Sequence, residues 1–170
     1  MIVIFEGVDG SGKSELAKWL AEEEPMFHLY TRDKTPLDGG LTVERTQGEN
    51  YGSMMMALQT GADVIFDRSF VSEWVYGHVM RGENSYDSVT VAELDAAVSK
   101  VPHMAVLMNF FDLVDTWERP VEHDPDVIAR LQDRYMLYVS NSQMNWHILD
   151  AGASRETVRE VLERRLNVPA

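Results

Sequence analysis

The sequence predicts an α/β fold with three layers, in which helices cover both faces of a parallel β-sheet. Short apolar, β-branched segments alternate with longer helical segments along the chain, and this alternation is typical of parallel sheets. The 170 residues, 45% of them hydrophobic, are enough for one domain with a sizeable core. We therefore expect a single domain over residues 1–170, without repeats or a linker.

The first predicted strand is Met1–Phe5, an apolar run typical of a strand buried on both faces. A glycine-rich segment, residues 7–14, follows directly, and Glu15–Ala21 is built of good helix formers. Pro25 breaks the helical pattern, and Phe27–Thr31 predicts a second strand. The chain thus opens with a strand, a loop, a helix and a strand.

Residues 33–50 are rich in Gly, Pro, Asp and Asn and predict a loop with room for a short helix. Tyr51–Thr60 is a methionine-rich helical segment, and Gly61 fits as the residue just past its end. Asp63–Asp67 predicts the third strand, and a helix is expected over Ser69–Met80.

Thr90–Glu93 has the pattern of a capping box, which predicts a helix from there to about Lys100. The fourth strand is predicted at His103–Phe110, with a continuous apolar core. A short helix is expected after it, from Asp112 to Glu118.

Asp124 followed by Pro125 is a typical helix start, because Asp caps the helix and Pro fits its first position. This helix should run to about Val139, and Asn145–Leu149 predicts the fifth strand. A last helix, capped by Ser154, is expected through Leu166.

Composition limits the possible functions. The chain contains no cysteine, so disulfides and thiolate chemistry are excluded, and its five histidines lack the spacing of metal ligands. It has no signal-peptide pattern and no long apolar run, so we expect a cytoplasmic protein without a membrane partner. The net charge of −13 argues against nucleic acid as a partner. A single nucleotide remains a suitable ligand, since a few cations can dominate one site.

The strongest motif is Gly7–Ser14, which reads G-x-x-x-x-G-K-[ST], the phosphate-binding P-loop. Its backbone N–H groups and the following helix N-terminus bind phosphate oxygens. Lys13 is expected to reach the β- and γ-phosphates, and the Ser14 hydroxyl to bind Mg²⁺. We therefore expect ATP and Mg²⁺ as ligands, held by Gly7, Asp9, Gly10, Ser11, Gly12, Lys13 and Ser14.

Two further segments directly follow predicted strands. They lie at the carboxyl edge of the sheet, where parallel sheets bind ligands. Asp67 and Arg68 follow the third strand, where the carboxylate can hold Mg²⁺ and the guanidinium can bind a phosphate at two points. Arg32 follows the second strand and could hold the phosphate of the acceptor. Lys13, Arg32, Asp67 and Arg68 are thus candidate catalytic residues.

Residues 5–14, F-E-G-V-D-G-S-G-K-S, resemble the opening of thymidylate kinases. Tyr30–Pro36 loosely resembles their T-R-E-P segment, and Phe66–Gly77 is similar to their D-R-Y-x-x-S-x-x-A-Y-Q stretch. Leu149–Ala151 resembles their last strand and the loop beside the adenine. The resemblance implies the P-loop kinase fold, with a five-stranded parallel sheet in the order 2-3-1-4-5.

The resemblance also implies roles for single residues. Asp9 would bind the 3′-hydroxyl of the acceptor, Arg32 and Arg68 its phosphate, and Ser72 and Tyr76 would line the base pocket. A lid over the donor phosphates would span about residues 117–134. The lid arginines would be Arg119, Arg130 and Arg134, of which Arg119 is a catalytic and Arg130 a nucleotide-binding candidate; Ala151 would lie beside the adenine.

The sequence departs from the family where the base is read. Gly77 replaces the glutamine of A-Y-Q, and Asp33 stands where Glu is usual. Residues 36–61 form a shorter segment than in the family, and Tyr51 is the candidate there for stacking on the base. The same segment supplies the family's dimer helices; a homodimer is compatible with the resemblance. Compact chains of this pattern resemble kinases of bacteriophages.

These features predict transfer of the ATP γ-phosphoryl group to a deoxynucleoside monophosphate, with thymidylate or a related pyrimidine deoxynucleotide as acceptor. A phosphate acceptor is a dianion at neutral pH and needs cations rather than a base. Two alternatives remain open. One is a kinase of deoxynucleosides, for which Asp33 could act as base, or of a modified base in DNA. The other is a regulatory module that binds nucleotide without catalysis.

Overall fold

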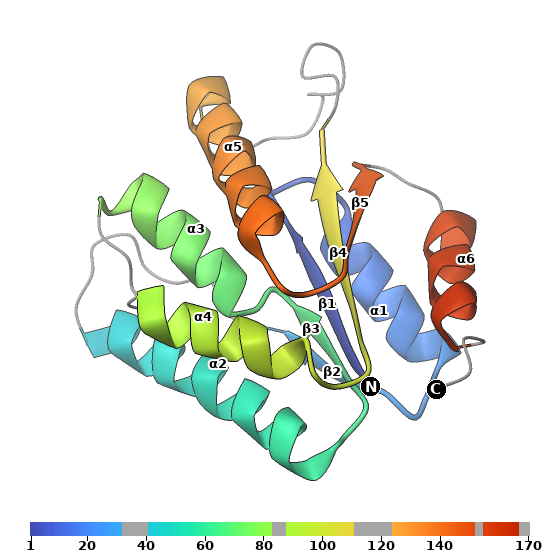
Figure 1. Cartoon of the computed structure of the whole chain (residues 1–170). Helices are drawn as coiled ribbons and strands as arrows, with labels where there is room; N and C mark the ends of the chain where they lie inside the picture. The colour runs from blue at the N-terminus through green and yellow to red at the C-terminus, as the bar shows by residue number, and fades with distance from the viewer. Residues whose placement is uncertain (32–40, 83–87, 111–123, 152–154, 167–170) are drawn as a thin grey trace.

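The computed structural model shows a sheet flanked by helices on both faces (Figure 1). It describes residues 1–31, 41–82, 88–110, 124–151 and 155–166. Within these ranges, every helix is too short or too polar to cross a bilayer.

The sheet has five strands, all parallel, in the order β2-β3-β1-β4-β5. The order that the resemblance implies is therefore confirmed. The strands are β1 (Ile2–Gly7), β2 (His28–Thr31), β3 (Val64–Asp67), β4 (His103–Asn109) and β5 (Trp146–Asp150). β1 lies in the centre and is buried over its whole length, as its apolar sequence predicts.

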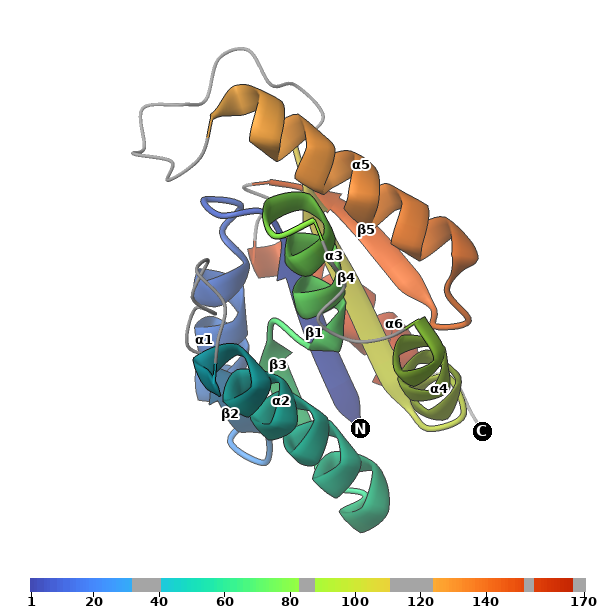
Figure 2. The same ribbon diagram turned by 90° about the vertical axis from the view of Figure 1, so that its left-hand side faces the viewer.

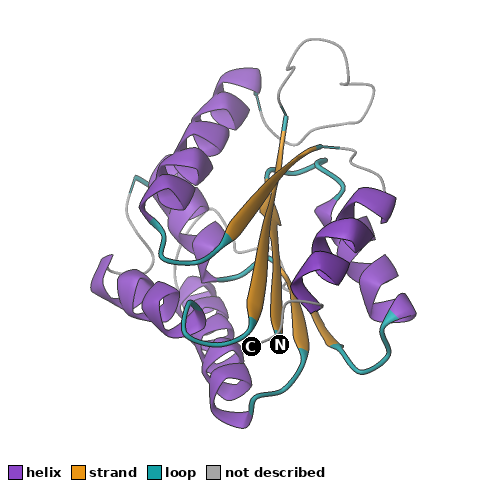
Figure 3. Ribbon diagram, turned by 45° about the vertical axis from the view of Figure 1, so that its right-hand side comes forward, coloured by secondary structure: helices purple, strands orange, loops and turns teal. Residues whose placement is uncertain are grey.

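Helices cover both faces of the sheet (Figure 3). Alternate residues of β1 point to opposite sides, so Val3 and Phe5 pack on α1 and α6, and Ile2 and Ile4 pack on the other four helices. α3 lies between α2 and α5 (Figure 2). The helices are α1 (Lys13–Glu23), α2 (Leu41–Thr60), α3 (Phe70–Met80), α4 (Ser88–Val98), α5 (Pro125–Asn141) and α6 (Arg155–Leu166).

The predicted helix starts and ends are confirmed at three places. Asp124 caps α5 by accepting a hydrogen bond from the Asp126 amide at 2.9 Å, and Pro125 opens the helix. Ser69 caps α3 by accepting from the amide of Val71. Gly61, at φ 66°, ends α2 with its N–H donated to the carbonyl of Ala57.

Two predictions about local structure are wrong. α2 begins at Leu41, so residues 41–50 are helical and not a loop. The glycine at position 48 favoured a loop in the sequence prediction. In the structure, burial of Met54 and Ala57 on the same helix offsets the low helix propensity of this glycine. α4 begins at Ser88, so Thr90 lies inside the helix and is not its cap. The short helix predicted at 112–118 and the cap at 154 lie outside the described residues.

Candidate active site

The P-loop and the end of β3 lie side by side at one edge of the sheet. β1 and β3 pair so that Phe5 lies opposite Asp67, and the amide of Arg68 donates to the Phe5 carbonyl at 3.0 Å. β1 leads directly into the P-loop at Gly7. The structure thus brings together the two motifs that are separated by more than fifty residues in the sequence.

The P-loop has the backbone that a phosphate site requires. Gly10 and Gly12 have φ of 82° and 84°, which favour glycine. Gly12 precedes α1 without a side-chain cap, so the first N–H groups of the helix remain available for an anion. A Cβ on Gly7 would lie 2.4 Å from the carbonyl oxygen of Met108, so this position requires glycine. Ser11 is buried, and its Oγ has no hydrogen-bond partner within the described ranges.

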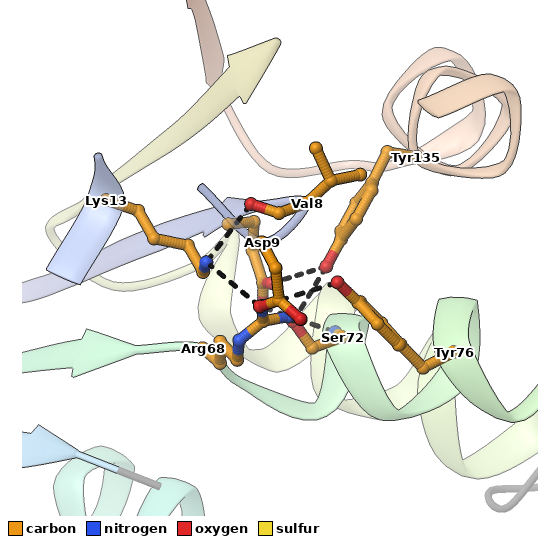
Figure 4. Close-up of polar contacts among 8 residues, drawn as sticks. Val8, Asp9, Lys13, Arg68, Ser72, Tyr76 and Tyr135 are labelled. Carbon is orange, nitrogen blue, oxygen red and sulfur yellow. Dashed lines mark hydrogen bonds and ion pairs between the residues drawn. The ribbon is translucent and has the colours of Figure 1, made fainter. Parts of the chain in front are cut away.

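Lys13 is buried at the start of α1, and its Nζ points across the loop (Figure 4). Nζ donates to the Val8 carbonyl at 3.2 Å and lies 3.9 Å from Oδ1 of Asp9. Burial and the positive charge of Arg68 lower the pKa of Lys13 to about 8, although Asp9, Asp67 and Glu6 oppose the shift. The ammonium group therefore titrates close to neutral pH.

Arg68 has a strained backbone that directs its side chain toward the P-loop. Its φ of 73° is in the left-handed region, which side chains other than glycine rarely adopt. Nη2 forms an ion pair with Oδ1 of Asp9 and donates to the Tyr76 hydroxyl at 3.3 Å, and Nη1 donates to Oγ of Ser72 at 3.2 Å (Figure 4). The Tyr76 ring lies 4.8 Å from the guanidinium carbon. The guanidinium is thus held in one orientation.

The surroundings of Arg68 keep it charged. Burial alone would lower its pKa, but Tyr76, Tyr135, Asp9 and Glu6 raise it above its ordinary value. Burial also raises the pKa of Tyr76, against the opposing effect of the Arg68 charge. The site therefore presents a permanent cation and a neutral phenol at neutral pH.

Glu6 connects the site to the core through hydrogen bonds. It is fully buried and accepts from the amide and Oγ of Ser69, both at 2.7 Å, and from the amide of Ser72 at 3.3 Å. Oγ of Ser72 and the hydroxyl of Tyr135, the latter at 3.2 Å, also donate to it. This carboxylate joins β1, the start of α3 and α5, and it fixes the serine that contacts Arg68.

Asp67 is the candidate metal ligand. Its side chain is buried, and its Oδ1 has no hydrogen-bond partner in the part of the chain that the structure describes. The described residues contain no group of three or more His, Cys, Asp or Glu side chains that could hold a metal alone. This pattern fits Mg²⁺, which is bound by one or two protein oxygens together with substrate phosphates. Asp67, with Ser14 at the start of α1, could supply them.

The predicted lid arginines are placed only in part. Arg130 is exposed on α5. The Arg134 guanidinium lies 4.0 Å from the centre of the Trp74 ring, and burial lowers its pKa. Trp74 and Ser72 lie on opposite sides of α3, because residues two apart in a helix point away from each other. The described contacts of Arg134 are therefore away from the Arg68 cluster.

The other predicted site residues are placed apart from these contacts or lie outside the described residues. Tyr51 is exposed on α2, and Ala151 donates its amide to the Asn109 carbonyl at 2.7 Å, at the end of β4. Arg32 and Arg119 are outside the described residues. Asp9, Lys13, Asp67, Arg68, Ser72 and Tyr76 are placed at the C-terminal edge of the sheet.

The sequence prediction assigned no role to Glu6 or Tyr135. A signal existed for Glu6, since it is the charged residue in an otherwise apolar strand beside the P-loop. Tyr135 carries no such signal, because an aromatic residue on the buried face of a helix is ordinary core. Its hydroxyl becomes informative only when the fold places it 2.8 Å from Oγ of Ser72.

Known proteins resemble this chain in sequence and in fold. No family model matches the chain. A protein from Acidianus bottle-shaped virus (isolate Italy/Pozzuoli), provisionally named a thymidylate kinase, is 27% identical over 141 residues, which cover 81% of this chain and 85% of the relative. The sequence of this chain is therefore similar to that of a viral protein named as a thymidylate kinase. This agrees with the resemblance in the P-loop and after β3, and it supports a kinase enzyme.

Solved structures share the fold of this chain. The YorR protein of Bacillus subtilis, solved in complex with phosphorylated GDP, has a TM-score of 0.69 at 15% identity and covers 100% of both chains. Thymidylate kinase from Ehrlichia chaffeensis has a TM-score of 0.64 at 17% identity, with 99% of this chain and 98% of that chain covered. Deoxyadenosine kinase from M. mycoides, with dCMP and dCDP bound, has a TM-score of 0.56 at 17% identity and 98% coverage of both chains.

Proposed function

We propose that this protein transfers the γ-phosphoryl group of ATP to a deoxynucleoside monophosphate, with thymidylate or a related pyrimidine deoxynucleotide as the acceptor. One observation carries the proposal: Arg68 is half-buried beside the P-loop and oriented by Asp9, Ser72 and Tyr76. A fixed cation next to a triphosphate site is what a second phosphate-bearing substrate requires.

Arg68 retains hydrogen-bonding capacity for such a substrate. A guanidinium carries about five N–H donors, and the bonds to Asp9, Ser72 and Tyr76 use Nη1 once and Nη2 twice. The N–H groups left on Nε and Nη1 remain for phosphate oxygens. Asp9 thereby acts first as the residue that positions Arg68, in addition to the 3′-hydroxyl contact that the resemblance implies.

The chemistry requires alignment and charge neutralisation more than proton transfer. A phosphomonoester has its second pKa near ~6, so the acceptor is largely a dianion at neutral pH and attacks without a general base. Lys13 would neutralise charge on the donor phosphates and Arg68 charge on the acceptor. Mg²⁺, when bound by Asp67, Ser14 and the phosphates, would supply further positive charge. Arg32 and Arg119 remain candidates for additional cations, as the resemblance implies.

The alternative acceptors differ in what they demand of the protein. A deoxynucleoside hydroxyl needs a carboxylate that accepts its proton. The Asp9 carboxylate is paired with Arg68 and lies near Lys13, which disfavours it as a base. Asp33 lies outside the described residues, so a nucleoside acceptor is an outcome that the experiment must distinguish.

The test incubates the purified protein with Mg-ATP and a panel of deoxynucleoside monophosphates and deoxynucleosides, and separates the products. We expect diphosphate products from the monophosphates alone. Phosphorylation of nucleosides alone would contradict the proposal and favour Asp33 as base. ATP binding without turnover of any compound would favour the regulatory alternative. Lys13→Ala, as the control, should abolish product formation.

A further inference from the structure

Asn50 is a buried polar side chain whose amide nitrogen has no hydrogen-bond partner in the described part of the chain. It lies on α2 and is 3% exposed, and its Nδ2 has no partner among the described residues. A buried donor without an acceptor costs free energy of folding. Such a cost in a small enzyme suggests that something other than the protein supplies the acceptor.

The neighbours of Asn50 on α2 show which way it faces. Gln47, Asn50 and Met54 lie three and four residues apart and share one face of the helix. Nε2 of Gln47 donates to Oε1 of Glu73 on α3 at 3.5 Å, and Met54 is buried in the core on the sheet. Asn50 lies between these two contacts, so its side chain faces α3 and the sheet.

This part of α3 borders the acceptor end of the site. Glu73 is fully buried and forms an ion pair with Arg81, and the next residue toward the N-terminus is Ser72, which holds Arg68 at 3.2 Å. Gly77 lies one turn beyond Glu73 on the same face of α3 and offers no side chain. Because Gly77 offers no side chain, a ligand beside this part of α3 can be contacted from α2, where Nδ2 of Asn50 is an unused donor among the described residues.

From this arrangement we infer that Asn50 is a specificity-determining residue that reads the edge of the acceptor base. The inference rests on the proposed function. Its Nδ2 donates to a carbonyl oxygen of the base, which satisfies the buried donor when the acceptor binds. Thymine and uracil offer that carbonyl oxygen where cytosine carries an amino group. The acceptor class is then a pyrimidine deoxynucleotide with a carbonyl group at this edge.

The experiment exchanges the donor for an acceptor. Wild type, Asn50→Asp and Asn50→Leu are assayed for kcat/KM with dTMP, dUMP and dCMP. A matched control is Gln59→Glu, which makes the same chemical change at an exposed position of α2. Mg-ATP affinity and the thermal midpoint are measured for each variant, so that damage to the fold is separated from loss of selectivity.

We expect Asn50→Asp to lower the ratio of kcat/KM for dTMP over dCMP by about 10–100-fold, because a carboxylate repels a carbonyl and accepts from an amino group. Asn50→Leu should raise the KM for dTMP by about 10-fold or more, with little change in kcat or in Mg-ATP affinity. Gln59→Glu should leave the ratio unchanged.

Two results would overturn the inference while leaving the proposed function intact. One is an unchanged dTMP to dCMP ratio in both Asn50 variants that still turn over monophosphates. The other is a stabilised Asn50→Leu protein with wild-type kinetics, which would make Asn50 a structural residue only. If wild type phosphorylates no monophosphate, the proposed function fails first, and the inference fails with it.

Discussion

Arg68 donates from Nη2 to the Asp9 carboxylate, and this ion pair joins the end of β3 to the P-loop. The two residues are far apart in the sequence, and the parallel pairing of β1 with β3 brings them together. The pair fixes a charged, half-buried guanidinium beside the phosphate-binding loop. The proposed binding of a second phosphate depends on this relationship.

Substitution of Arg68 tests that relationship. Arg68→Ala should lower kcat/KM for the acceptor by about 10²–10³-fold, since one charge-stabilising group in a site of this kind is worth that much. Arg68→Lys keeps the charge but loses the planar set of N–H donors that contacts Asp9, Ser72 and Tyr76, so it should recover only part of the activity. Steady-state kinetics with varied acceptor will measure both. Wild-type kinetics in Arg68→Ala would remove this residue from the site.

The lowered pKa of Lys13 predicts how ATP binding depends on pH. Phosphates bind the ammonium form, which is lost as pH rises through about 8 in the free protein. The Kd for Mg-ATP should be constant below about pH 7 and rise by up to about tenfold per pH unit above 8. Calorimetric titration from pH 6.5 to 9.5 will show this. Lys13→Arg, which stays charged, should lose the dependence, and a flat wild-type profile would contradict the prediction.

The same shift has a consequence for stability. Lys13 has a lower pKa in the folded protein than the value of 10.5 for the unfolded chain, so the unfolded state binds more protons between about pH 8 and 10.5. The Lys13 contribution to the free energy of unfolding therefore becomes more favourable as pH rises through this window. The burial cost of its charge is fully present below pH 8.

Asp67→Asn tests the candidate metal ligand. Removing its charge should raise the Mg²⁺ concentration needed for half-maximal activity by about 10–100-fold, the size of effect found when groups around metal sites are lost. The free energy of unfolding should not fall, because Oδ1 has no hydrogen bond to lose among the described residues. Titrations of Mg²⁺ at fixed ATP, together with urea unfolding, provide the two readouts. An unchanged Mg²⁺ requirement would exclude Asp67 as a ligand.

Glu6→Gln should destabilise the protein by about 3 kcal/mol, since an amide NH₂ would face hydrogen-bond donors that now point at a carboxylate. These donors come from Ser69, Ser72 and Tyr135. Urea unfolding measures the loss. Glu93→Gln on the exposed face of α4 is the matched control and should change stability by less than about 0.5 kcal/mol. Equal effects of the two changes would show that the Glu6 network adds no stability.

Gly48→Ala tests the unexpected first half of α2. A Cβ at this position meets nothing within 4 Å, and the residue is exposed, so the change should stabilise the helix by about 0.5–1 kcal/mol. Gly61→Ala should have the opposite effect, because φ of 66° disfavours a side chain. Thermal unfolding of both variants is the measurement. Destabilisation by Gly48→Ala would mean that residues 41–50 are not helical in solution.

The sequence predicted the fold well because its signals are local. The apolar strands, the cap at Asp124 and the helix that begins beside Ser69 follow from neighbouring residues, and the structure confirms them. The start of α2 was missed because its helix depends on packing of Met54 and Ala57 in the core, which outweighs the glycine within it.

The motifs of the site could be predicted from the sequence, but the hydrogen bonds that connect them could not. The P-loop and the Asp67–Arg68 pair stand out in the sequence, but the network through Glu6 and Tyr135 joins residues up to 129 positions apart. Such contacts are created by the tertiary fold. The same holds for Asn50, whose missing partner is visible only when its burial is known.

The most direct test of the central claim follows the phosphorus atoms themselves. Phosphorus NMR of the wild-type protein with Mg-ATP and dTMP, or the monophosphate that the panel favours, should show ADP and the deoxynucleoside diphosphate growing in equal amounts. Arg68→Ala under the same conditions should slow both signals together. Consumption of ATP with the monophosphate unchanged, or product formed only from a nucleoside, would contradict the account.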